Sequence, residues 1–168
     1  MRSIFVLLMV LSFETIKAQS FTNIAHDQGI VASASGNYGN GVSFYDWNKD
    51  GFDDVSLNSS VTGPRFFQNN NGFFTEVFFS GLNITGDCKA INWVDMNNDG
   101  FPDISFNTYL GKLRFFINDG NFQFTEISLT CGINQDLLWG YALSWADYNK
   151  DGFLDVYVSN YMDSTVTN

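Results

Sequence analysis

The sequence predicts an all-β protein made of propeller blades, each with four antiparallel strands. A nine-residue motif, D-x-N-x-D-G-F-x-D, occurs at 46–54, 95–103 and 147–155, so the chain repeats with a period of about 50 residues. Apolar and polar residues alternate on both sides of each copy, which is typical of half-buried strands joined by a turn. No segment after residue 18 has the periodicity of a helix.

Residues 1–18 have the pattern of a secretory signal peptide. Arg2 gives a basic start, an apolar run covers 4–13, and a polar segment ends at Ala18, after which we expect cleavage. The apolar run is too short to cross a bilayer as a helix. We therefore expect a secreted, periplasmic or cell-surface protein without a membrane span after cleavage.

The remaining residues, 19–168, are predicted to form one repeat region. Its start, 20–30, aligns with the end of both later blades, which predicts a lone last strand of a blade. Complete blades are expected at 41–80 and 89–130, because each contains the motif followed by an R-F-F strand and an F-T-E strand. The first half of a third blade is expected at 140–168.

These strands are too few to close a ring, since propellers typically have about four to eight blades. We therefore expect an incomplete propeller, the N-terminal fragment of a longer protein. The alternative is an oligomer that completes the ring between chains. An open stack would leave strand edges exposed, and exposed edges favour aggregation.

The motif has the residue types of a calcium loop. Oxygen-bearing side chains occupy positions 1, 3, 5 and 9, and Ca²⁺ takes about six to eight oxygen ligands. Position 6 is glycine in every copy, which allows a sharp turn. Position 7 is phenylalanine, whose carbonyl is a further candidate ligand while its ring is expected to pack inward. The predicted ligands of up to three Ca²⁺ ions are Asp46, Asn48, Asp50, Phe52 and Asp54; Asp95, Asn97, Asp99, Phe101 and Asp103; Asp147, Asn149, Asp151, Phe153 and Asp155.

Other interpretations of the motif fit less well. Mg²⁺ demands tighter octahedral geometry, and soft metals prefer His or Cys, which the loops lack. An EF-hand needs an acid at position 12, where this chain has Leu57, Phe106 and Val158. Asx-turns without metal explain Asp and Asn in turns, but they require no acid at position 9.

Composition limits the classes of function. The formal charge is -10 and no basic patch is visible, which argues against nucleic-acid binding. The sequence offers few candidate catalytic residues. His26 has only Asp27 beside it, and Cys88 and Cys131 lie in no recognisable catalytic motif. Whether the two cysteines pair stays open.

The motif, followed by R-F-F-x-N and F-T-E-V/I, resembles the FG-GAP/VCBS repeats of integrin α-chains, cartilage acidic protein and many secreted bacterial proteins. The segments GYALSWADYNKDGFLDVYVSNY and FTNIAHDQGI are most similar to the cartilage-acidic-protein-like branch. The resemblance implies a propeller of six to eight blades with Ca²⁺ in the loop between the first two strands of a blade. Asn stands at position 3, where many members have Asp, which keeps the oxygen and removes a charge.

Two functions from different classes follow. The first is a calcium-binding platform for adhesion or for binding an extracellular protein or polysaccharide. Trp139, Tyr141 and Tyr109 are candidate exposed aromatics on it, and burial in the core is the ordinary interpretation of each. The alternative is the N-terminal part of a secreted polysaccharide-active enzyme whose catalytic residues lie outside this chain. The absence of a catalytic constellation in this chain favours the first.

Overall fold

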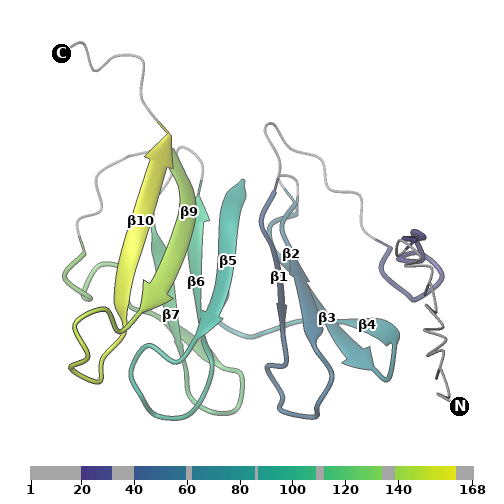
Figure 1. Ribbon diagram of the computed structural model, residues 1–168, viewed down its shortest axis with the longest axis horizontal. Helices are drawn as coiled ribbons and strands as arrows, with labels where there is room; N and C mark the ends of the chain where they lie inside the picture. Colours follow the sequence, from purple (N-terminus) through teal and green to yellow (C-terminus); the bar gives the residue numbers. More distant parts are fainter. Residues whose placement is uncertain are drawn as a thin grey trace, which may run out of the picture.

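The computed structural model of the chain describes residues 20–31, 40–59, 62–85, 87–108, 112–133 and 139–161 (Figure 1). The predicted signal peptide lies outside these residues. The described part contains ten strands and no helix. The strands are β1 (Val42–Tyr45), β2 (Asp54–Leu57), β3 (Arg65–Asn70), β4 (Phe73–Val77), β5 (Cys88–Val94), β6 (Asp103–Thr108), β7 (Arg114–Asn118), β8 (Phe124–Glu126), β9 (Trp139–Ala146) and β10 (Asp155–Tyr161).

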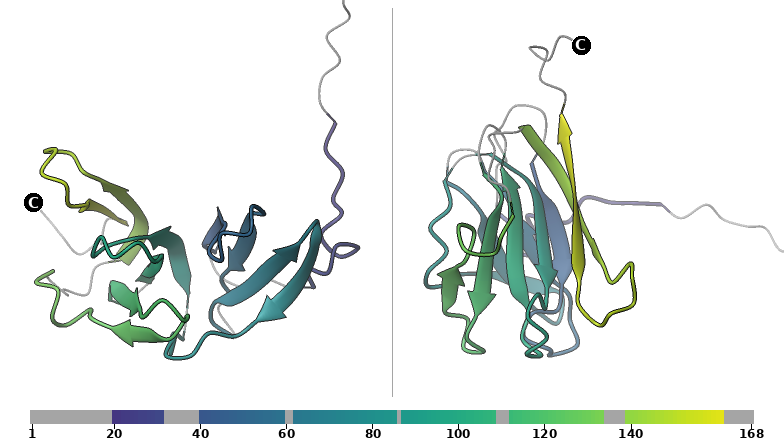
Figure 2. Two further views of the ribbon diagram at one scale, coloured as in Figure 1. Left: turned by 90° about the horizontal axis from the view of Figure 1, so that it is seen from below. Right: turned by 90° about the vertical axis from the view of Figure 1, so that its left-hand side faces the viewer.

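The strands form two four-stranded sheets and one hairpin, all antiparallel. The first sheet has the order β1-β2-β3-β4, the second has the order β5-β6-β7-β8, and β9 pairs with β10. The sheets stand side by side, with β5 between β1 and β9 (Figures 1 and 2). The prediction of an all-β fold with four-stranded antiparallel blades is confirmed. The sheets do not close into a ring, so the described residues form an incomplete propeller.

The core lies between the blades, and one contact repeats from interface to interface. Trp93 in β5 is buried and packs edge-on against Phe66 of the first sheet, with ring centroids 5.9 Å apart. Its indole Nε1–H donates to Oγ of Ser56 in β2 (2.9 Å). At the next interface, Trp145 in β9 donates in the same way to Oγ of Ser105 in β6 (3.1 Å). The alternation on the first strand of each blade therefore serves packing against the preceding blade.

The R-F-F and F-T-E motifs pair across the outer hairpin of each blade. Arg65 in β3 donates two hydrogen bonds to the carboxylate of Glu76 in β4 (both 2.6 Å) and a third to the carbonyl of Val31 (3.0 Å). In the second blade, Arg114 forms the same pair with the glutamate of its own F-T-E strand and donates to the carbonyl of Asn83 (3.2 Å). Each arginine thus joins its own blade to the segment that precedes that blade.

Residues 20–30 do not form the lone strand that the sequence predicts. A turn covers 25–29, and the N–H of Gln28 donates to the carbonyl of Ile24 (3.0 Å). A strand needs a hydrogen-bonded neighbour for its backbone, and no described strand pairs with this segment; the side chain of Phe21 is 87% exposed. The alignment with other blade ends identified a blade terminus but not its conformation.

Residues 20–30 nevertheless contact the first blade in the same way that the end of the first blade contacts the second. The N–H of Phe74 in β4 donates to the carbonyl of Gln28 (2.7 Å), and the N–H of Phe124 in β8 donates to the carbonyl of Ser80 (2.9 Å). A glycine in the left-handed conformation directly follows each acceptor, with φ of 93° and 88°. The segment therefore occupies the place that a preceding blade's end would take.

Candidate metal sites

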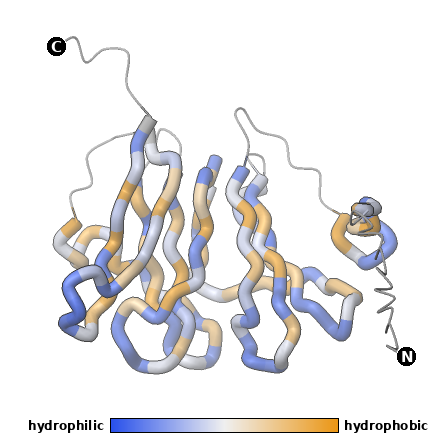
Figure 3. Tube along the Cα trace, in the orientation of Figure 1, coloured by the Kyte–Doolittle hydropathy of each residue, from blue (hydrophilic) through white to orange (hydrophobic). Residues whose placement is uncertain are grey.

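The three motif loops lie at the same end of the sheets. They connect β1 to β2, β5 to β6 and β9 to β10. In Figure 1 all three are at the lower end, and Figure 3 shows that hydrophilic residues gather there, while hydrophobic and more polar residues alternate along the strands. The repeat thus places three similar carboxylate-rich turns next to one another. We call them loop 1 (46–54), loop 2 (95–103) and loop 3 (147–155).

In loop 1 the side chains at positions 1, 3 and 5 converge on one turn of backbone. The carboxylate of Asp46 accepts from the N–H of Asp50 (3.0 Å) and of Gly51 (2.8 Å). The amide oxygen of Asn48 accepts from the same Asp50 N–H (3.0 Å), and its Nδ2 donates to Oδ2 of Asp50 (2.8 Å). Oδ1 of Asp50 accepts from the N–H of Phe52 (2.9 Å). These groups are brought together as the spacing predicts.

The same arrangement occurs in the other two loops. The carboxylate of Asp95 accepts from two backbone N–H groups of loop 2 (3.1 and 2.8 Å), and that of Asp147 does so in loop 3 (3.1 and 2.9 Å). The amide at position 3 donates to the carboxylate at position 5 in both loops (2.8 and 2.9 Å). The loop conformation is therefore a property of the motif and not of one blade. The residues concerned are Asp95, Asn97 and Asp99, and Asp147, Asn149 and Asp151.

Two backbone positions in each loop are left-handed. Position 6 is the predicted glycine, with φ of 93°, 88° and 91°. Position 4, which the sequence analysis treated as variable, also has positive φ: 59° at Lys49, 59° at Asn98 and 62° at Lys150. The sequence gives little indication of a left-handed backbone at position 4, because asparagine favours this conformation but lysine does not.

Position 9 has a structural role that the sequence analysis missed. Asp54 is fully buried, and its carboxylate accepts from the N–H of Trp47 (3.2 Å) and from the N–H of Asn69 in β3 (2.8 Å). Asp103 accepts from Met96 (2.9 Å) and from Asn118 in β7 (2.8 Å). In loops 1 and 2 the acid at position 9 therefore ties the loop to the third strand of the blade, where it meets the asparagine of R-F-F-x-N. In loop 3, Asp155 accepts from the N–H of Tyr148 (3.3 Å).

Burial and neighbouring charges change the ionisation of these acids. Burial raises the pKa of Asp54 to about 6; the backbone N–H groups of Asn69 and Trp47 lower it, and the carboxylates of Asp50 and Asp46 raise it. The pKa of Asp103 is raised to about 6 for the same reasons. Ionised carboxylates close together repel one another, and a cation among them would relieve this repulsion.

The donor set fits a hard cation better than a soft one. Among the described residues, no three or more His, Cys, Asp and Glu side chains are grouped so as to hold a metal ion by themselves. A full ligand set in these loops would therefore also need the amide oxygen at position 3 and a backbone carbonyl. Oxygen donors of these kinds are those that Ca²⁺ uses.

The rings at position 7 do not pack inward as the sequence analysis expected. Phe52 is 40% exposed, Phe101 44% and Phe153 64%. Gly120, in the turn after β7, lies against the Phe101 ring, where a Cβ would come within 2.9 Å of it. The rings at position 7 are thus partly exposed at the loop end of the blades.

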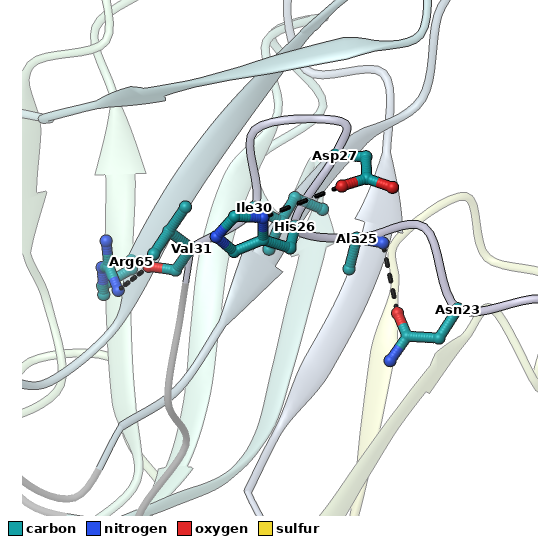
Figure 4. A pocket seen from close by; sticks show the side chains of 7 residues that line it. All are labelled: Asn23, Ala25, His26, Asp27, Ile30, Val31 and Arg65. Atoms are coloured by element: carbon teal, nitrogen blue, oxygen red, sulfur yellow. Dashed lines mark hydrogen bonds and ion pairs between the residues drawn. The ribbon is translucent and has the colours of Figure 1, made fainter.

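The other candidate residues form no catalytic set. His26 and Asp27 are both exposed, with 3.8 Å between Nδ1 and Oδ1. They line a hollow of about 550 Å³ with Arg65, whose guanidinium is already bonded to Glu76 and Val31 (Figure 4). Among the described residues that line this hollow, none is a serine, threonine, cysteine or lysine.

The cysteines and the candidate contact aromatics have different surroundings. Cys88 and Cys131 are both free thiols, and burial raises the pKa of Cys88 to about 12. Tyr141 is 50% exposed. Tyr109 and the side chain of Trp139 lie outside the described part of the chain.

Comparison with known proteins identifies the repeat. A family model, the FG-GAP-like repeat, matches residues 46–106 and again 95–158, which together make up more than half of the chain. Each match begins at the first aspartate of one motif loop and contains the whole of the next loop. A search of curated proteins finds no match. Within the part of the chain that the structure describes, no helix is long and hydrophobic enough to cross a bilayer. With its repeated loops and blades, the chain belongs to the FG-GAP-like repeat family.

Proposed function

We propose that this β-propeller-like repeat protein is secreted, that Ca²⁺ stabilises its loops, and that it acts as a platform for adhesion or for binding an extracellular protein or polysaccharide. The observation that carries the proposal is the identical arrangement of oxygen-bearing side chains in the three loops. Hydrogen bonds in loop 1 use both oxygens of Asp46, Asp50 and Asp54, and they still leave three carboxylates close together, whose mutual repulsion a cation would relieve.

The residues that would hold the ion in loop 1 are Asp46, Asn48, Asp50 and Asp54, with the carbonyl of Phe52 as backbone donor. The corresponding residues of loops 2 and 3 would do the same. When bound, the ion supplies positive charge to a cluster of carboxylates. The chain itself positions the ligands: backbone N–H groups orient the acids, and the acid at position 9 anchors loop 1 to the blade.

Two further observations support a location outside the cell. FG-GAP repeats are typical of extracellular and surface proteins. The N-terminal sequence has the pattern of a signal peptide. A binding platform is supported by the fold, because loops on a rigid scaffold are where recognition residues gather.

A thermal melt of the chain in excess Ca²⁺ and in EDTA tests the calcium proposal. A ligand that binds only the folded state at a hundredfold excess over Kd stabilises it by about 2.7 kcal/mol. For a chain of this size, that corresponds to a rise in Tm of roughly 5–10 °C per occupied site. A midpoint indifferent to Ca²⁺ would refute the calcium proposal.

Two single substitutions in loop 1 provide the matched comparison. Asp50→Asn removes a proposed ligand carboxylate, and Asp53→Asn removes the neighbouring exposed carboxylate at position 8, which is not a proposed ligand. Both change the formal charge by the same amount. We expect Asp50→Asn to reduce the Ca²⁺-dependent shift and Asp53→Asn to leave it unchanged. Equal losses in both would mean that Ca²⁺ acts only by screening.

A further inference from the structure

Adjacent loops are joined by side chains that cross from one blade to the next. The Nζ of Lys49 in loop 1 donates to the carbonyl of Gly100 in loop 2 (2.7 Å). The Nδ2 of Asn98 in loop 2 donates to the carbonyl of Gly152 in loop 3 (2.7 Å). Donor and acceptor occupy the same motif positions in both cases: position 4 of one loop and position 6 of the next.

The acceptor carbonyl belongs to a peptide unit that is held at both ends. In loop 2 this unit joins Gly100 to Phe101. Its carbonyl accepts from Lys49, and its N–H donates to Oδ1 of Asp99 (2.8 Å). The carbonyl that follows, on Phe101, is the proposed backbone ligand, and Asp99 is a proposed side-chain ligand. Lys49 therefore touches the backbone that orients two groups of the neighbouring site.

The donor at position 4 lies within its own loop and has a left-handed backbone. Lys49 lies between the proposed ligands Asn48 and Asp50, with φ of 59°. An ion bound in loop 1 would fix the residues on either side of Lys49, and so would fix the start of its side chain. The same argument applies to Asn98, between Asn97 and Asp99.

We propose that the residue at position 4 is a positioning residue for the calcium site of the next loop, so that neighbouring sites bind Ca²⁺ with positive coupling. The inference rests on the proposed function. Groups behind the ligands set ligand orientation and so influence metal affinity. A donor that holds the loop in its binding conformation reduces the ordering that binding requires. Coupling between two sites is reciprocal, so each ion favours its neighbour.

The chain provides a matched control for the test. Lys150 occupies position 4 of loop 3 with nearly the same φ, 62°, and its side chain makes no hydrogen bond or ion pair within the described part of the chain. Lys150→Met therefore measures what this substitution does to its own loop. Lys49→Met measures that effect together with the loss of the bond to loop 2. Lys49→Arg retains N–H donors and charge, and serves as the conservative variant.

The experiment is a Ca²⁺ titration of the full chain followed by NMR. Gly51, Gly100 and Gly152 each report on one loop through their backbone amide resonances. We expect Lys49→Met to weaken Ca²⁺ binding in loop 2 by about three- to tenfold, the range expected for one hydrogen bond. We expect Lys49→Arg to restore it and Lys150→Met to leave loop 2 unchanged.

A double-mutant cycle tests the coupling itself. Disabling loop 1 with Asp50→Asn is expected to weaken loop 2 in the wild-type background but not further in Lys49→Met. If Ca²⁺ shifts none of the glycine resonances, the proposed function fails and the coupling fails with it. If Ca²⁺ binds but Lys49→Met leaves loop 2 unchanged, only the coupling is overturned. If Lys49→Met tightens loop 2, the ammonium repels the ion and the positioning role is refuted.

Discussion

Replacement of Trp93 by phenylalanine tests how the blades are held together. Trp93 is 7% exposed, and its indole ring lies within 6.2 Å, centroid to centroid, of Tyr45, Trp47 and Phe66. Its Nε1–H donates to the hydroxyl of Ser56, which has no exposed surface. Phenylalanine keeps an aromatic ring at this position but removes the donor and part of the ring.

The cost of this change has two parts. A buried hydroxyl left without its donor costs about 1–3 kcal/mol. The smaller ring leaves part of a cavity; full truncation of a buried tryptophan to alanine costs about 3–5 kcal/mol, so the partial change costs roughly 1 kcal/mol. We therefore expect Trp93→Phe to lower the free energy of unfolding by about 2–4 kcal/mol, a large share of the roughly 5–15 kcal/mol of a typical domain.

Urea unfolding followed by circular dichroism, with Ser56→Ala as the second arm of a double-mutant cycle, separates the two parts. Ser56→Ala alone leaves the indole N–H unpaired, whereas the double variant removes both partners. The double variant should therefore be less destabilised than the sum of the singles by about 1–2 kcal/mol. Trp145→Phe repeats the test at the next interface, where Trp145 is half-buried and the loss should be smaller. Additivity to within about 0.5 kcal/mol would refute the hydrogen bond as the link between blades.

Three further predictions concern a glycine between blades, the two cysteines and the arginine–glutamate pair of the first blade. Gly81→Ala should lower the free energy of unfolding by several kcal/mol, because a Cβ at this position would overlap a carbonyl oxygen of the next blade. Gly132 also has a left-handed backbone, but a Cβ there would meet no neighbour, so Gly132→Ala should cost only about 1 kcal/mol in urea unfolding. Maleimide should label Cys131 and spare Cys88 in the folded chain, since Cys88 is fully buried with its pKa raised to about 12, whereas denatured protein should label at both. The arginine hydrogen-bonded to Glu76 lowers the pKa of this carboxyl, so the stabilisation from this pair is present above the unfolded pKa and is lost as the pH falls through the folded pKa. The free energies of unfolding from urea titrations at pH 7 and pH 3 should therefore differ less in Glu76→Gln than in the wild type, by about 0.5–1 kcal/mol for this partly exposed pair.

Much of the fold could be predicted because the repeat supplies three versions of the same local signal. Alternation around each loop located strands such as β1 and β5, and the glycine at position 6 located the turn. The strand predicted at 20–30 is absent from the structure because strand formation depends on a hydrogen-bonded partner. A sequence match to the end of another blade carries no information on whether a neighbouring strand is present.

The links between blades could not be predicted, because they depend on residues far apart in sequence. Trp93 and Ser56 are 37 positions apart, and Lys49 and Gly100 are 51 apart. Each residue alone has an ordinary interpretation: an aromatic in a strand, a small polar residue in a strand, a lysine in a loop. Only the packing of one sheet against the next shows that these residues recur at matching places in successive interfaces.

The acid at position 9 changes what calcium would have to do in this chain. In the sequence alone this acid indicates a metal, since an Asx-turn does not need it. In the structure, Asp54 and Asp103 each accept two backbone N–H groups and hold the loop against the third strand. These hydrogen bonds fix the side of the loop that faces the blade and so lower the ordering that an ion entering the loop requires. Its contribution would come from relieving the repulsion among the acids at positions 1, 5 and 9, which is why we expect a carboxylate-specific response to Ca²⁺ in place of a folding transition.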